Sequence, residues 1–277
     1  MTAISMTPMS VTPIVPRDLD VDFAAVPRYW MANNATATAI ANGVNLLFPH
    51  GERYFVRSVK HFLPKVEDPS LRAAIKGFFG QEGRHAHAHD DFIEILRTQG
   101  YEVDRFLTHF KQISSWLERT LPPKLNLAIT AACEHFTAIL AEGAFERGML
   151  DAAAPEMRQL LAWHAAEEIE HKAVAYDVLQ LVDPSYALRT TGLLFATAIL
   201  GGFWAWGAAS LLRQDRTGPR KALKQLGVLP RTPIVTGVFL RGIRQYLRRN
   251  FHPRDNANDQ LAHDWMAARG MSMPEAA

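Results

Sequence analysis

The chain has 277 residues, of which 48% are hydrophobic and 21% are charged, and these values exclude a disordered or fibrous protein. Lys and Arg number 30 against 28 Asp and Glu, so the net charge of +2 argues against a general nucleic-acid binder. Cys133 is the single cysteine. A disulfide framework and a thiolate-rich zinc or iron–sulfur site are therefore excluded, and any metal must be held by nitrogen and oxygen atoms.

The N-terminal part of the chain reads as an arm followed by helices. The first sixteen residues contain three Met and three Pro and no charged side chain. We therefore expect residues 1–20 to form a flexible arm, disordered or wrapped on the surface. A helical stretch over 29–47 is predicted next, interrupted near Pro49 and resumed over 52–62. Pro64 should end it, because proline is disfavoured in a helix interior.

Clear start and stop signals delimit the following helices. Asp68 and Pro69 predict a helix start, and the helix should run to Thr98 with Gly100 as its C-terminal cap. A shorter amphipathic helix over 103–119 and two long helices over 123–147 and 155–181 follow. Residues 21–183 thus contain four long helices and one connecting helix. The predicted fold is all-α, a four-helix bundle with a crossover connection and additional C-terminal helices.

Residues 184–277 differ in composition from the bundle region. The 23 residues 190–212 carry no charge, which is long enough to cross a bilayer. Their Gly and Ala content is equally suited to a closely packed buried helix. A second apolar patch, Ile234–Leu240, is flanked by Arg residues, as at an anionic membrane surface. We expect a cytoplasmic protein, and the sequence leaves open whether residues 190–212 attach it to the inner membrane.

The same short motif occurs on two of the predicted long helices. Glu82 is followed three residues later by His85, and Glu168 is followed three residues later by His171. A three-residue step returns almost to the same helix face one turn along, so the carboxylate and the imidazole of each pair can bind one metal. Either motif alone is weak evidence, because charged residues on a solvated face produce it often.

The other two long helices each contain a suitably placed glutamate. Glu52 lies 30 residues before Glu82, and Glu134 lies 34 residues before Glu168. Glu134 stands in an otherwise apolar stretch, where an unpaired carboxylate is costly to bury. Two Glu-x-x-His helices and two Glu helices are the ligand plan of carboxylate-bridged di-iron and di-manganese bundles.

Further histidines and one glutamate extend this set. His164 shares a helix face with Glu168 and His171 and would add a nitrogen ligand. His89 lies one turn beyond His85, where it is a further ligand or, more simply, a partner of a carboxylate. Glu167 competes with Glu168, because spacing alone allows either one to face the metal. The mixture of imidazole and carboxylate at a paired site favours iron, with manganese or zinc as alternatives.

This ligand order resembles the ferritin-like di-iron superfamily and, more narrowly, the p-aminobenzoate N-oxygenase group. The resemblance covers roughly residues 45–180, selects Glu168 over Glu167 and leaves Glu167 and His89 as supporting groups. It implies that Glu82 and Glu168 bridge two iron ions. The implied metal ligands are Glu52, Glu82, His85, Glu134, His164, Glu168 and His171.

A second resemblance covers most of the chain. The stretches FPHGERYFVRSVKHF, FFGQEGRHAHAHDDF and WHAAEEIEHKAVAYDV are similar to a bacterial family called predicted metal-dependent hydrolases. Because that name carries no demonstrated mechanism, the expected activity follows from the ligand set instead: a di-iron oxidase or oxygenase acting on a small or lipid-like organic substrate. Its partners would be dioxygen and an electron donor, with a homodimer left open. The alternatives are a dinuclear metal-dependent hydrolase and a non-catalytic, membrane-attached iron-binding protein.

Overall fold

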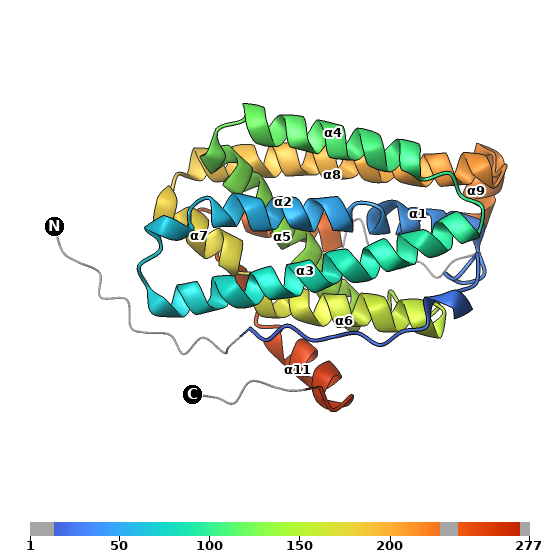
Figure 1. Cartoon of the computed structure of the whole chain (residues 1–277), viewed down its shortest axis with the longest axis horizontal. Helices are drawn as coiled ribbons and strands as arrows, with labels where there is room; N and C mark the ends of the chain where they lie inside the picture. The colour runs from blue at the N-terminus through green and yellow to red at the C-terminus, as the bar shows by residue number, and fades with distance from the viewer. Residues whose placement is uncertain (1–13, 228–237, 272–277) are drawn as a thin grey trace.

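The computed structural model describes residues 14–227 and 238–271 (Figure 1). These residues form helices joined by short connections, with one isolated β-bridge between Met31 and Ala153. The prediction of an all-α helical bundle is confirmed. The elements in chain order are η1 (Phe23–Ala25), α1 (Ala35–Asn45), α2 (Phe48–Lys60), η2 (Leu63–Lys65), α3 (Pro69–Thr98), α4 (Asp104–Thr120), α5 (Pro123–Glu146), α6 (Pro155–His171), α7 (Val174–Val182), α8 (Tyr186–Gln214), α9 (Pro219–Gly227), α10 (Arg241–Tyr246), η4 (Pro253–Asp255) and α11 (Asp259–Ala267).

Four helices form the core that positions the candidate site. Helix α2 packs against α3 and α5, and α6 packs against α5 and α3, so the four enclose a common interior (Figure 1). Outside this core, α4 contacts α2, α8 covers α5 and α1, and α11 lies against α6. The long helices bury apolar side chains toward one another, and Phe78, Leu127, Leu160 and Ile169 are fully enclosed.

Two helix boundaries differ from the sequence expectations. Residues 29–34 are not helical, and Asn34 instead caps α1 by accepting hydrogen bonds from the amides of Thr36 and Ala37. The interruption expected near Pro49 is present at Leu46 and Leu47, but the helix resumes at Phe48 rather than at residue 52, because Pro49 lies in the first turn of α2, where no intrahelical N–H bond is lost. In contrast, α3 begins at Pro69 with Asp68 as its cap and ends at Thr98, as predicted.

The predicted helix over 155–181 is two helices in the structure. α6 ends at His171, and α7 starts at Val174. Neither Gly nor Pro marks the break, so the sequence carries no signal for it. At the break the Lys172 amine is buried and donates to the Asn256 carbonyl at 2.9 Å and to Asn258 Oδ1 at 2.6 Å. These bonds join the last turn of α6 to the C-terminal segment.

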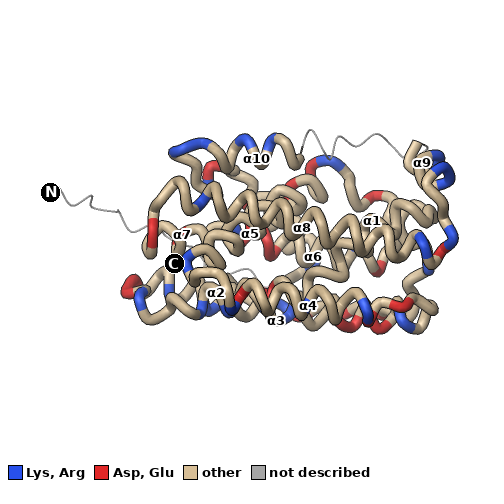
Figure 2. Tube along the Cα trace, turned by 90° about the horizontal axis from the view of Figure 1, so that it is seen from above, with Lys and Arg blue, Asp and Glu red and all other residues tan. Residues whose placement is uncertain are grey.

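Helix α8 contains the uncharged run 190–212. It is the one helix in the described part of the chain that is long and apolar enough to cross a membrane, and 33% of its most apolar 18-residue window is buried. Figure 2 shows its uncharged middle between basic residues on α9 and around α10. At Gly192 a Cβ atom would lie 2.5 Å from the Ala128 backbone, so glycine permits the close contact with α5. Membrane contact by the outer face of α8 stays a prediction.

The terminal regions are only partly described. Residues 1–13 of the expected arm lie outside the described residues, as do residues 234–237 of the second apolar patch. Residues 14–20 run beside α3 and α6 (Figure 1), and Ile14 and Arg17 are buried. This segment thus adds side chains to the interior next to the four-helix core.

Candidate metal centre

Each of the four core helices directs one glutamate into the shared interior. Glu52 comes from α2, Glu82 from α3, Glu134 from α5 and Glu168 from α6. Their exposed fractions are at most 3%. Burial of four carboxylates at one place is costly unless cations or protons neutralise them.

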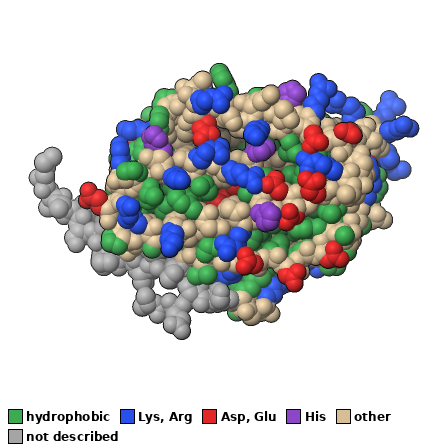
Figure 3. Space-filling model, in the orientation of Figure 1, with side chains coloured by type: hydrophobic (Ala, Val, Ile, Leu, Met, Phe, Trp, Pro, Cys, Tyr) green, Lys and Arg blue, Asp and Glu red, His purple; other side chains and the backbone are tan. Residues whose placement is uncertain are grey.

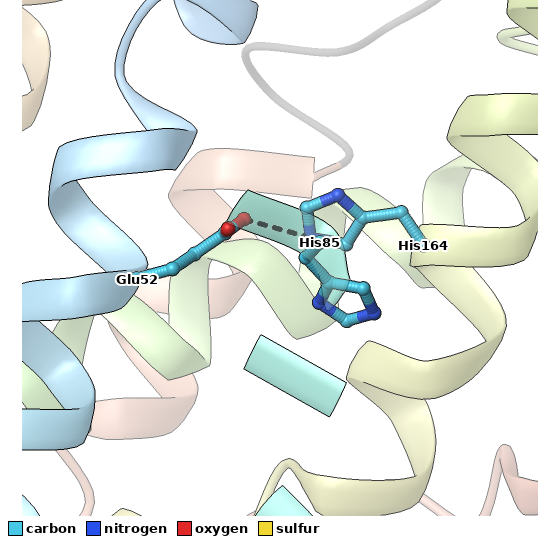
Figure 4. Close-up of side chains that lie close together, drawn as sticks. All are labelled: Glu52, His85 and His164. Carbon is cyan, nitrogen blue, oxygen red and sulfur yellow. Dashed lines mark ion pairs between the residues drawn. The ribbon is translucent and has the colours of Figure 1, made fainter. Parts of the chain in front are cut away.

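Three histidines face the same space. His164 Nε2 lies 2.8 Å from Glu168 Oε1 and 3.5 Å from Glu52 Oε1. Figure 4 shows Glu52 extending from α2 toward the rings of His85 and His164. His171 Nε2 lies 3.1 Å from Glu82, 3.3 Å from Glu134 and 3.4 Å from Glu168. Imidazole nitrogens and carboxylate oxygens from four helices therefore converge.

The donors fall into three overlapping groups whose ligand atoms lie within 4.8 Å of one another. Glu82 and His85 each belong to two of the three groups. Glu52 and His164 occur only in the first group given below, and Glu134 and His171 occur only in the third. This overlap is what a site for two neighbouring ions requires, because the shared residues can serve both. The groups are Glu52, His85 and His164; Glu82, His85 and Glu168; and Glu82, Glu134 and His171.

Most of the donor atoms have no hydrogen-bond partner in the described part of the chain, and coordination of a metal ion would satisfy them. Both carboxylate oxygens of Glu52, Glu82 and Glu134 are buried without a hydrogen-bond partner among the described residues. The same holds for Nδ1 of His85 and Nε2 of His171. Buried polar atoms are nearly always paired in folded proteins, so a set of unpaired atoms aimed at one point fits an N/O-ligated metal.

A surrounding layer of hydrogen bonds orients two of the three imidazoles. His85 Nε2 pairs with Glu167 Oε2 at 3.0 Å, and His171 Nδ1 pairs with Gln81 Oε1 at 2.9 Å. In each case the opposite ring nitrogen is left facing the interior. Such partners fix the ring and tautomer of a metal-ligating histidine.

The two residues with open roles in the sequence lie in this outer layer. Glu167 contacts the far side of the His85 ring, whereas Glu168 lies within the donor cluster. His89 Nε2 contacts His164 Nδ1 at 2.8 Å, so His89 touches a neighbouring imidazole and lies outside the three donor groups.

Sequence reasoning missed two residues of the outer layer. Arg17 binds Glu167 through its backbone N–H at 3.0 Å and through its guanidinium at 3.2 Å. Gln81 binds His171 and also donates to Glu170 at 2.7 Å. No sequence motif includes Arg17. Gln81 does carry a signal, because it is the polar neighbour of the donor Glu82 on a buried helix face.

The chain matches the family model described as "Predicted metal-dependent hydrolase" over residues 15–257. The chain belongs to this family. The match includes every helix that supplies a donor, so the family's metal dependence agrees with the buried His and Glu groups found here. Comparison with curated proteins gives no match, and comparison with solved structures gives none either.

Burial and mutual repulsion act strongly on the clustered carboxylates. Burial, together with the neighbouring glutamates, raises the pKa values of Glu52 and Glu82 well above the usual range. Burial also raises the pKa of Glu134 to about 7. Glu168 differs, because the attraction of His171 and His164 outweighs burial and lowers its pKa. Binding of a metal ion would therefore displace protons from Glu52, Glu82 and Glu134, whose pKa values are raised.

The metal-free protein is expected to lose stability between pH 7 and 8. Burial raises the pKa of Glu134 to about 7 and that of Glu167 to about 8, while unfolded glutamates titrate near 4.5. The folded state then binds more protons than the unfolded state, so the free energy of unfolding falls as pH rises. Histidines whose pKa burial lowers, such as His85 and His89, oppose this trend mainly below pH 7.

Urea titrations of chelator-treated protein at pH 7 and 8 would measure this loss, which should be on the order of 2 kcal/mol. The metal-loaded protein should show the opposite trend, since binding is tighter once the ligands are ionised. Equal unfolding free energies of the metal-free protein at both pH values would contradict the assignment of protonated buried carboxylates.

Proposed function

We propose that the four-helix core holds two iron ions and uses them to oxidise a small apolar organic substrate with dioxygen. The observation that carries this proposal is the convergence of four buried carboxylates and three imidazoles, most of whose donor atoms have no hydrogen-bond partner among the described residues. Carboxylate-rich donor sets with imidazole suit iron. The proposed ligands are Glu52, Glu82, His85, Glu134, His164, Glu168 and His171.

Bound iron would supply electrons for the reduction of dioxygen, and the residues of the chain would control its surroundings. The glutamates would neutralise the cations. Glu82 belongs to two of the three donor groups, and Glu168 belongs to the group that shares a residue with each of the other two, which supports the proposal that these two glutamates would hold both ions. Glu167 and Gln81 hold the rings of His85 and His171 in orientation. Burial of the donors excludes bulk water from the site.

Hydrolysis is the second candidate, and the description of the family favours it. Two zinc or manganese ions in the same donor set would supply a nucleophilic hydroxide and stabilise the leaving group. The buried carboxylate Glu52, with both oxygens unpaired, faces the interior where such a reaction would take place. This reaction needs no dioxygen, which separates the two candidates experimentally.

Anaerobic loading with ferrous iron, followed by addition of air, tests the proposal. We expect oxygen uptake at an electrode and a change in visible absorption, and both should be absent when Glu82 is replaced by Leu. Zinc- or manganese-loaded protein would be assayed in parallel, without oxygen, on 4-nitrophenyl esters. Ester hydrolysis without oxygen uptake would show that the protein is a hydrolase and would refute the proposed oxidation. Stable metal binding with neither reaction would indicate a non-catalytic metal-binding protein.

A further inference from the structure

A separate apolar cavity adjoins the candidate metal centre. It lies between α2, α4, α5 and α8, has a volume of about 80 Å³ and includes Glu52 in its wall. One water requires about 10–15 Å³ measured in this way, so the cavity is several times larger than a single water site. Leu47, Phe55, Phe110, Ile129 and Leu200 form much of its surface.

The hydroxyl groups in the wall already use their hydrogens in bonds within the protein, so none of them is free to donate to a ligand. Tyr54 Oη contacts Asn126 Oδ1 at 2.9 Å, Ser114 Oγ donates to the Phe110 carbonyl at 2.6 Å, and Thr137 Oγ1 donates to the Glu134 carbonyl at 2.9 Å. Glu52 also lies in the wall, but its carboxylate is directed toward His164 and the metal centre (Figure 4). The cavity thus presents almost entirely apolar surface, and its Glu52 end borders the metal centre.

The α4 wall connects this cavity with an apolar part of the surface. Ser114 and Leu117 line the cavity and are half-buried, while Ile113 and Trp116 beside them on α4 are 40% and 56% exposed. Hydrophobic side chains also form patches among charged ones on the face of the molecule in Figure 3. An apolar molecule arriving at α4 would therefore meet apolar surface before entering the cavity.

We propose that this cavity binds a small apolar organic molecule, about the size of a single ring or a short alkyl chain, with one end against Glu52. The proposal rests on the proposed function only in making this molecule the substrate of the metal centre. Apolar cavities of this kind exclude water and accept apolar ligands of matching size, because few polar groups are desolvated on binding. The Glu52 end of the cavity lies next to the metal centre, because Glu52 Oε1 is 3.5 Å from His164 Nε2.

The test uses trifluoromethylbenzene as the probe and follows its ¹⁹F NMR signal with the full-length, metal-loaded protein. The decisive variant is Gly51→Leu. Gly51 lies in the cavity wall, and the nearest heavy atom to an added Cβ would be the Phe55 ring at 3.9 Å. Leu therefore fits on α2 and occupies the cavity, and it also favours the helix more than Gly does.

Gly83→Leu is the matched control. Gly83 directly follows the donor Glu82 on α3, as Gly51 directly precedes Glu52 on α2, but Gly83 is exposed and an added Cβ would meet nothing within 4 Å. We expect the probe to bind the original protein and Gly83→Leu equally. Its affinity for Gly51→Leu should fall at least tenfold, while the metal content stays unchanged.

Benzamide, which has the same ring with a polar group, provides the second comparison. It should compete with the probe at least tenfold less well than toluene. The proposal is overturned if the probe does not bind, if Gly51→Leu binds it equally, or if benzamide competes as well as toluene. Metal uptake, measured separately, distinguishes the two proposals. If the chain takes up no added iron, zinc or manganese but still binds the probe, the metal centre is refuted and the apolar cavity is supported.

Discussion

Replacement of Glu82 by Leu is expected to remove most of the bound metal and, at the same time, to stabilise the metal-free protein. Glu82 belongs to two of the three donor groups, so its loss affects both proposed ion positions. In the metal-free state it is a buried carboxylate whose pKa is raised by burial and by Glu134. Both of its carboxylate oxygens are buried without a hydrogen-bond partner among the described residues, which costs about 1–3 kcal/mol, and an apolar side chain of similar size removes that cost.

Metal analysis after purification, combined with urea unfolding after chelation, would measure both effects. The matched control is Glu142→Leu, which removes another buried glutamate from the same core. Glu142 is bonded to Asn258 at 2.9 Å and to Arg241 at 2.7 Å and lies outside the donor groups. This variant should keep its metal and lose stability, by about 1–3 kcal/mol. If both variants kept their metal, Glu82 would not be a ligand.

Removal of the metal from the unaltered protein should lower its melting temperature by roughly 10 °C. An ion that binds the folded state, present at about 1,000 times its dissociation constant, stabilises that state by about 4 kcal/mol. For a chain of this size, 1 kcal/mol corresponds to about 2–4 °C. The effect should be large because Glu52, Glu82 and Glu134 lie together with unpaired oxygens once the cations are gone.

Thermal unfolding with and without a chelator, at constant pH, would measure this shift. Addition of ferrous iron under nitrogen should restore the higher melting temperature. The Glu82→Leu variant supplies the control, since its melting temperature should respond little to the chelator. If neither the chelator nor the added iron changed the melting temperature of the unaltered protein, a strongly bound metal centre would be excluded.

The helical architecture and the gathering of the glutamates follow from local sequence signals. Asp68 and Pro69 predict the start of α3, and the structure has that start. The three-residue spacing of Glu82 and His85 predicts a common helix face, and both side chains belong to one donor group. These inferences succeed because helix capping and helix periodicity depend on neighbouring residues.

Other features depend on contacts between distant parts of the chain and had no local signal. The bond from Arg17 to Glu167 joins residues 150 positions apart. Helix α6 ends at His171, where the next residue, Lys172, bonds to the C-terminal segment. Neither Gly nor Pro marks this helix end in the sequence. The choice between Glu167 and Glu168 likewise depends on the rotation of α6 relative to α3, which spacing along one helix does not determine.

The spread of the donor residues along the chain has a consequence for biosynthesis. The three donor groups combine side chains that begin at Glu52 and end at His171. A nascent polypeptide therefore cannot assemble any complete set of ligands until the segment that carries His164, Glu168 and His171 has emerged and docked. We therefore expect complete coordination of an ion only after α6 has docked against α3 and α5.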